Sequence, residues 1–323
     1  MSDREEKTGK NDNGKKNKGG KRNKIVAIEM IILVLLIMSA VAIFIQRDKS
    51  VKEAAKIHNQ KAKKTEQTPQ TAQKENEIEE ETEGTEEETG DRDASVPDRS
   101  NFAVQPGVSV GTTEQSDEKI VYLTLDDGPS DNTQAVLDIL DKYNAKATFF
   151  VTGEMPEYKD MIKAAYDKGH TIGMHTYSHD YAKVYASVDA YFQDLDQIGQ
   201  MVQEEIGYVP CFIRFPGGSS NTVSKKYTAG IMSTLVQEVQ NRGYQYYDWN
   251  GSSGDGSVRT TEELVAQATS FDSNNIILLC HDSHGKQTTV EALPQIIEHY
   301  QSLGYTFKAL DLDSFVAHHG VNN

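Results

Sequence analysis

The chain has 323 residues, of which 37% are hydrophobic and 25% charged, and its formal net charge is −16. This acidity argues against a nucleic-acid partner, because a negative surface is repelled by the phosphate backbone. Two cysteines, Cys211 and Cys280, are too few for a disulfide framework or a cysteine-rich zinc site. Cys211 opens one predicted strand and Cys280 closes another, so we expect no bond between them.

The first 45 residues predict a membrane anchor. Residues 1–24 are rich in Lys and Arg, and residues 25–45 form an almost unbroken apolar run, long enough as a helix to span a bilayer. The basic flank predicts a cytoplasmic tail at 1–24 and places everything after the transmembrane helix at 25–45 outside the cell membrane. A cleaved signal peptide is the alternative, since 40–42 reads Ala-Val-Ala, but the run is longer than a typical signal core.

Residues 46–116 predict a disordered stalk. The segment is Lys-rich at first and strongly acidic from 75 to 91, with few apolar residues. Such a composition buries too little surface to offset the entropy of ordering the chain. We therefore expect a solvated spacer that leads to one folded domain at 117–323.

The folded part alternates short β-branched or aromatic runs with amphipathic helices, as a parallel sheet with crossover helices requires. The predicted strands are 120–125, 147–152, 171–174, 212–215, 244–249, 276–280 and 306–310. The predicted helices are 132–143, 156–168, 187–206, 223–242, 261–270 and 290–303. Glycines that follow four of the helices suit left-handed caps: Gly169, Gly207, Gly243 and Gly304. The pattern predicts an α/β fold, a distorted or incomplete (β/α) barrel of about seven strands, because roughly 200 residues is small for a complete one.

Polar clusters stand where the predicted strands end. The first is the adjacent pair Asp126 and Asp127, whose charges repel unless a cation or a proton intervenes. His175 and His179 follow a later strand and offer two imidazoles four positions apart. Because carboxyl ends of parallel strands share one face, Asp127 and these histidines predict a zinc site with an open position; another divalent metal such as Co2+ is the alternative.

Two further strands end in residues with acid–base or charge-pairing chemistry. Arg214 follows one strand and His281 follows another, so the fold would aim both at the same cavity. Taken singly, each also fits a structural role, as an ion pair or a hydrogen-bonded core histidine. The coincidence of several such clusters favours one site.

The ordered set of motifs over residues 119–312 resembles the polysaccharide deacetylases of carbohydrate esterase family 4, in particular membrane-anchored bacterial peptidoglycan N-acetylglucosamine deacetylases. The resemblance implies that Asp126 is the catalytic base, although Leu125 replaces the usual Phe before it. It also implies that Asp127, His175 and His179 bind the metal.

The later motifs carry the remaining roles. The Arg-x-Pro motif implies that Arg214 pairs with the base and that the Gly217 amide helps hold the oxyanion. The Leu-x-His motif implies that Leu279 lines the acetyl pocket and that His281 is the general acid.

The fourth motif departs from the family pattern. Aligned on Trp249, it puts Ser252 and Asp255 at the two Asp positions and implies that Asp255 orients His281 and raises its pKa. Asp248, directly before Trp249, offers a competing register. The aromatic residues near the strand ends are candidates for stacking on sugar rings, with ordinary packing as the alternative; they are Tyr177, Tyr181, Tyr246 and Trp249.

The resemblance and the anchor together predict metal-dependent hydrolysis of N-acetyl groups on a cell-wall polysaccharide, most simply the N-acetylglucosamine of peptidoglycan. An O-acetyl esterase or a deacetylase of an exopolysaccharide or chitin-like chain is the alternative, since the motifs do not separate these substrates. An inactive glycan-binding surface protein is a second alternative, and a structural wall-anchoring protein a third. Retention of both Asp residues, both ligand histidines, Arg214 and His281 argues against the glycan-binding protein, because binding alone requires no general acid. A metal-dependent turnover assay would separate the structural protein from the other two alternatives. No protein partner is inferable.

Overall fold

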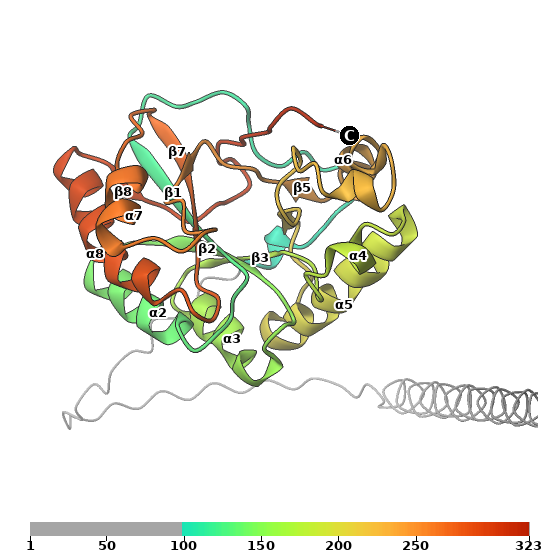
Figure 1. Ribbon diagram of the computed structural model, residues 1–323, viewed down its shortest axis with the longest axis horizontal. Coiled ribbons are helices and arrows are strands. Elements are labelled where there is room, and N and C mark those ends of the chain that lie inside the picture. Colours follow the sequence, from blue (N-terminus) through green and yellow to red (C-terminus); the bar gives the residue numbers. More distant parts are fainter. Residues whose placement is uncertain (1–98, 323) are drawn as a thin grey trace, which may run out of the picture. The chain divides into compact units, whose positions relative to one another are not determined.

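The computed structural model describes residues 99–322 (Figure 1). The helices within this range are α2 (Thr133–Lys142), α3 (Asp160–Asp167), α4 (Tyr181–Val184), α5 (Val188–Ile206), α6 (Ile231–Asn241), α7 (Thr261–Ala268) and α8 (Gln287–Ser302), with short 3-10 turns η1 (Ser100–Phe102), η2 (Pro156–Tyr158) and η3 (Ser224–Lys226). The strands are β1 (Ile120–Asp126), β2 (Ala147–Val151), β3 (Thr171–Met174), β4 (Phe212–Ile213), β5 (Gln245–Tyr246), β6 (Gly251–Ser252), β7 (Asn275–His281) and β8 (Thr306–Phe307).

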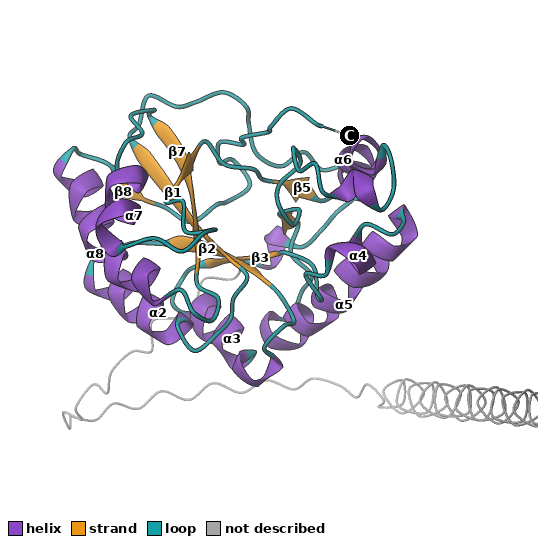
Figure 2. Cartoon of the chain, in the orientation of Figure 1, coloured by secondary structure: helices purple, strands orange, loops and turns teal. Residues whose placement is uncertain are grey.

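All the strands pair in parallel in one sheet of order β5-β4-β3-β2-β1-β7-β6, and β8 adds to the start of β1. Helices cover the outer face of this sheet (Figure 2). The path ends at β5 and at β6, so the hydrogen-bonded ring does not close within residues 99–322. The α/β half-barrel predicted from the sequence is confirmed, with β6 as an additional two-residue strand.

Strand alternation decides which side chains face the interior. In β1, Val121, Leu123 and Leu125 belong to the large apolar cluster formed with the helices. Ile120 and Tyr122 belong instead to the smaller cluster inside the half-barrel. The same alternation directs the next even-numbered positions of β1 inward, toward the mouth where the strands end.

The segment before β1 closes the opposite end of the half-barrel. Cys211 N–H donates to the carbonyl of Phe102, and Gly111 N–H donates to that of Leu312. Val110 is buried in the interior cluster, with Phe102 and Val104 packed against it. Within the described residues, 99–116 therefore make ordered contacts with the domain, although the sequence assigned them to the stalk; Val110 and the residues packed around it supply buried apolar surface there.

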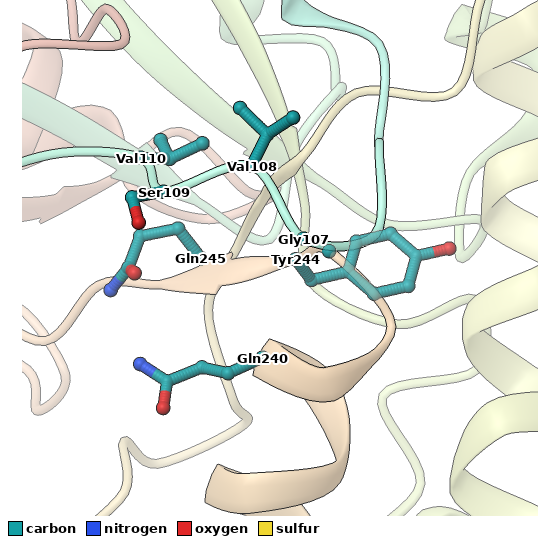
Figure 3. Close-up of a pocket in the computed structure, with 8 residues that line it drawn as sticks. Gly107, Val108, Ser109, Val110, Gln240, Tyr244 and Gln245 are labelled. Atoms are coloured by element: carbon teal, nitrogen blue, oxygen red, sulfur yellow. The ribbon is translucent and has the colours of Figure 1, made fainter.

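A hollow of about 260 Å3 lies at this closed end, and Figure 3 shows its lining. Gly107 to Val110 form one side, and Gln240, Tyr244 and Gln245 form the other. Because β5 begins at Gln245, the hollow lies where the strands start, away from the predicted polar clusters.

Most of the local elements follow the sequence, but β4, β5 and β8 each have two residues where four to six were predicted. The four capping glycines all have positive φ, between 84° and 90°. The helix expected over 223–242 is divided into η3 and α6, because Gly230 adopts a left-handed conformation with φ 76°. The short helix α4 was not expected; Asp180 begins it by accepting a hydrogen bond from the Ala182 amide.

The predicted anchor at 25–45 and most of the stalk lie outside the described residues. Among residues 99–322, no helix combines the length and apolar character needed to cross a membrane. Cys211 and Cys280 are both buried and free, as expected.

Candidate active site

The predicted catalytic residues meet at the carboxyl ends of the strands. β1 and β7 pair in register from Ile120 with Asn275 to Asp126 with His281, so two strand ends carry the two residues side by side. Met174, the last residue of β3, pairs with Ile213 of β4, which brings His175 and Arg214 to adjacent positions. The fold therefore gathers residues separated by more than 150 positions into one cluster.

Three donor atoms converge at this mouth. Asp127 Oδ1 lies 3.4 Å from His175 Nε2 and 3.3 Å from His179 Nε2. These are the three residues predicted as metal ligands, and one ligand atom from each lies within 4.8 Å of the others. Asp127 Oδ1 is buried and has no hydrogen-bond partner within residues 99–322, although a buried carboxylate oxygen normally has one. A cation coordinated by the three side chains would satisfy it, so the residues fit a metal.

Backbone conformation and tautomer both orient the side chains of this candidate metal triad. Asp127 and His179 adopt left-handed conformations, with φ 67° and 48°, which turn their side chains toward the mouth. His175 Nδ1 lies 2.8 Å from the Arg214 carbonyl and donates its proton to it, which leaves Nε2 as the free lone pair. Burial lowers the pKa of His175, and the neutral ring is the form that binds a metal.

Asp126 lies beside the triad and is held by Arg214. The Arg214 side chain is fully buried and donates from Nη1 to Asp126 Oδ1 at 2.8 Å and to Thr124 Oγ1 at 2.8 Å. Its remaining nitrogens donate to the carbonyls of Tyr247 and Asp248. The arginine is thus a positioning residue for Asp126: its hydrogen bonds fix one carboxylate oxygen and leave Oδ2 directed toward the triad, 3.9 Å from His175 Nε2.

His281 faces Asp127 from the other side of the mouth. Its Nε2 lies 3.9 Å from Asp127 Oδ2, and its Nδ1 lies 2.8 Å from Asp255 Oδ1. Asp255 Oδ2 also accepts hydrogen bonds from the His281 amide and Thr289 Oγ1, both at 2.8 Å. Burial opposes protonation of the ring, but the hydrogen bond and charge of Asp255, with the charges of Asp126 and Asp127, outweigh it and raise the pKa of His281 to about 9.

These contacts distinguish the two registers of the fourth motif. Asp255 is the carboxylate that supports His281. Asp248 is fully buried and holds a different segment: its oxygens accept from the Ser219 amide, the Ser219 hydroxyl and the His319 amide. It therefore joins the loop after Arg214 to the C-terminal segment.

Gly217 and Leu279 lie at the mouth. Gly217 is exposed, has φ 75°, and its amide has no acceptor within residues 99–322, so its N–H is free to bind a ligand. Leu279 pairs with Thr124 and Ser252 and is 7% exposed. By strand alternation it points inward with His281, two positions later.

Two of the four candidate aromatic residues, Trp249 and Tyr177, have different surroundings. Trp249 lies over the Arg214 guanidinium at 5.7 Å and is fixed by an edge contact with His319, with ring centroids 4.8 Å apart. Tyr177 packs over Gly153 and borders a surface hollow of about 360 Å3 together with Gln197 and Gln200 of α5. Their part in substrate binding stays a prediction.

Sequence reasoning missed Asp282. This buried carboxyl accepts from Thr133 Oγ1 at 2.6 Å, and its amide donates to the carbonyl of Asp126. Burial, together with the nearby charges of Asp127 and Asp126, raises its pKa to about 7. The position of Asp282 directly after His281 was the available sequence signal. Only the fold shows that Asp282 packs against the loop at Gly128, where an added Cβ would lie 2.3 Å from Asp282 Oδ1.

This chain belongs to the polysaccharide deacetylase family. A sequence profile described as "Polysaccharide deacetylase" matches residues 113–236. The putative polysaccharide deacetylase YheN of Bacillus subtilis is 30% identical over 217 residues, which cover 64% of this chain and 72% of that protein.

Its relatives include enzymes named for the bacterial cell wall. A peptidoglycan-N-acetylglucosamine deacetylase of Bacillus cereus is 29% identical over 226 residues, covering 65% of this chain and 78% of that protein. The crystal structure of the catalytic domain of a peptidoglycan N-acetylglucosamine deacetylase from Eubacterium rectale shares 47% identity and a TM-score of 0.63. The match covers 65% of this chain and 97% of the chain in that crystal structure.

Proposed function

We propose that this protein hydrolyses N-acetyl groups of a cell-wall polysaccharide in a zinc-dependent reaction, with the N-acetylglucosamine of peptidoglycan as substrate. The observation that carries the proposal is the triad of Asp127, His175 and His179, flanked on one side by Asp126 and on the other by His281. The peptidoglycan deacetylases among the relatives support the choice of substrate.

Asp127, His175 and His179 would hold the zinc ion. A bound zinc polarises a carbonyl and lowers the pKa of a coordinated water toward about 7. Cobalt could occupy the same donor set, since imidazole and carboxylate ligands suit several divalent metals.

The chain's own residues supply the proton transfers. Asp126 is placed to accept the proton of the attacking water, because Arg214 fixes one of its oxygens and leaves the other facing the triad. His281 is placed to protonate the departing nitrogen, since Asp255 favours its protonated form. The free amide of Gly217 is a candidate donor to the oxyanion.

Removal of O-acetyl groups is the second candidate function. A bifunctional xylanase/deacetylase of Pseudobutyrivibrio xylanivorans is 32% identical over 207 residues, although these cover only 31% of that protein. The xylanase in its name is the support for an acetylated xylan as the alternative substrate. The same site would hydrolyse an ester, whose alcohol is a better leaving group than an amine.

The test measures acetate release by the full-length protein, purified in detergent, from peptidoglycan, N-acetylglucosamine oligomers and O-acetylated xylan. Each substrate is incubated with zinc or with a chelator, and an Asp126→Asn variant serves as the control. We expect zinc-dependent release from the N-acetylated substrates, lost in the variant while zinc stays bound. Release from acetylated xylan alone would replace the proposal with the esterase, and zinc-bound protein without any release would refute both.

We further propose that residues 25–45 anchor the protein in the cell membrane with the catalytic domain outside. The support is the apolar run and its basic flank at 1–24. Two experiments on cells that express the full chain test this. Before protease treatment, we expect the chain in the membrane fraction. When protease is added outside intact cells, we expect loss of the catalytic domain. Recovery of the chain in the soluble fraction would contradict it.

A further inference from the structure

Tyr181 at the start of α4 reaches the turn that carries the candidate oxyanion amide. A Cβ built on Gly217 would lie 2.6 Å from the Tyr181 hydroxyl oxygen, so this hydroxyl occupies the space that a side chain at 217 would take. The absence of a side chain at Gly217 therefore allows the phenol to approach the backbone closely.

The same ring contacts the metal triad. Tyr181 packs edge-on against His179, with ring centroids 5.8 Å apart. It packs edge-on against Tyr185 on another side, with centroids 5.5 Å apart. These contacts fix the ring, so its hydroxyl is held between the turn at Gly217 and a candidate metal ligand.

Other polar side chains at this turn are already engaged. Tyr185 Oη donates to the carbonyl of Pro216 at 2.8 Å, and Asn221 Nδ2 donates to that of Gly218 at 2.8 Å. The Tyr181 hydroxyl, by contrast, has no hydrogen-bond partner within residues 99–322, and the side chain is only partly buried. It is a neutral, oriented donor that is open to a ligand.

We propose that Tyr181 is a catalytic residue that donates a hydrogen bond from its hydroxyl to the oxygen of the substrate carbonyl as that oxygen gains negative charge. When water adds to the carbonyl carbon, a C–O bond forms and the π-electron pair moves to this oxygen. The Gly217 amide and the Tyr181 hydroxyl would then bind it together. This inference rests on the proposed deacetylase function and adds a side-chain donor to the backbone one.

A bond that strengthens as charge develops lowers the barrier more than it strengthens substrate binding. A hydrogen bond to a charged group is worth more than one between neutral groups, so its loss is expected to lower kcat by about 10- to 100-fold with little change in KM. A purely structural role would instead lower stability or metal content, and a ground-state contact with a sugar hydroxyl would raise KM.

The experiment compares full-length wild type, Tyr181→Phe and Tyr227→Phe, each loaded with zinc. Tyr181→Phe keeps the ring and its packing against His179 and Tyr185. Tyr227, 45% exposed on the surface, provides a matched loss of one phenol hydroxyl away from the site. Zinc content and Tm are measured first, then kcat and KM on an N-acetylglucosamine tetramer. The last measurement is inhibition by a tetramer analogue in which a methylphosphonamidate replaces an N-acetyl group. This group is a tetrahedral anion that resembles the product of water addition to the carbonyl.

We expect Tyr181→Phe to match wild type in zinc content and Tm, to lose kcat by about 10- to 100-fold, and to bind the phosphonamidate more weakly by a similar factor. Tyr227→Phe should match wild type throughout. Unchanged kcat, a change confined to KM, or unaltered inhibition would each overturn the role of Tyr181 while leaving the deacetylase function intact. An inactive zinc-loaded wild type would refute both the deacetylase function and the role of Tyr181, even if it bound the phosphonamidate.

Discussion

Replacing Asp255 by Asn tests how the site keeps His281, the proposed general acid, protonated. In the wild type, the carboxylate accepts the Nδ1 proton of His281 at 2.8 Å and also holds the His281 amide. An amide of the same shape can keep the Thr289 hydrogen bond, but it removes the negative charge that favours the imidazolium.

The size of the effect follows from the pKa of His281. The difference between about 9 and the ordinary 6.5 corresponds to about 3.4 kcal/mol in favour of the charged ring. At pH 7.5 a group of pKa 9 is about 97% protonated, whereas one of pKa 6.5 is about 9% protonated. Burial of His281 would lower the pKa further once Asp255 is lost, so kcat/KM at pH 7.5 should fall about tenfold or more.

Two measurements check this reasoning. NMR titration of the metal-free protein should place the His281 ring near pH 9 in wild type and at or below about 6.5 in Asp255→Asn. The pH profile of kcat/KM in the zinc-loaded enzyme should show a basic limb, because a general acid works only while protonated, and the variant should move that limb to lower pH. Asp131→Asn is the matched control, since it removes a carboxylate that contacts the exposed His284 instead.

A limb that stays in place in Asp255→Asn would refute the assignment of His281 as the general acid. A limb that moves equally in Asp131→Asn would show that long-range charge, and not the hydrogen bond to Asp255, sets the profile.

Two further predictions concern stability. Arg214→Met leaves the buried Asp126 without its partner and should lower the free energy of unfolding by about 3–5 kcal/mol in urea denaturation, with part of the loss recovered in an Arg214→Met/Asp126→Asn double variant; a loss below about 1 kcal/mol would contradict this. For Asp282 the pKa rises from 3.8 to about 7 on folding, so the native state binds more protons between these values and wild-type stability should fall as pH rises through that window. In the metal-free protein, Asp282→Asn should remove this fall in stability, which amounts to about 4 kcal/mol at most. If the free energies of unfolding of wild type and variant differ by a constant amount from pH 4 to 8, the raised pKa of Asp282 is contradicted.

The sequence predicted much of the site because parallel strands deliver their last residues to one face. Asp126 and His281 end β1 and β7, and each strand could be recognised from its β-branched and apolar residues. The capping glycines divided the chain into βα units, so the order of strands and helices also followed.

The rest depended on contacts that no local pattern encodes. Asp248 and Asp255 lie on either side of the two-residue strand β6, where there is too little periodicity to fix a register, and only the fold shows which of them faces His281. α4 is four residues long and gives no amphipathic signal. The approach of Tyr181 to Gly217 joins the start of α4 to a turn 36 positions later, so it is recognised only once the fold brings both to the mouth.

The site separates the proposed acid, His281, from the proposed base, Asp126, because each of the two is paired with a residue of opposite charge. Asp126 and His281 occupy paired positions of neighbouring strands, where direct contact would let the imidazolium neutralise the carboxylate. Arg214 instead takes Oδ1 of Asp126 from inside the half-barrel, and Asp255 takes Nδ1 of His281 from the side of β6. Asp126 Oδ2 and His281 Nε2 remain outside these pairings, and each lies 3.9 Å from a member of the triad. Because both partners are buried, the arrangement is fixed before substrate arrives, which is the condition that the proposed proton transfers by Asp126 and His281 require at this candidate metal site.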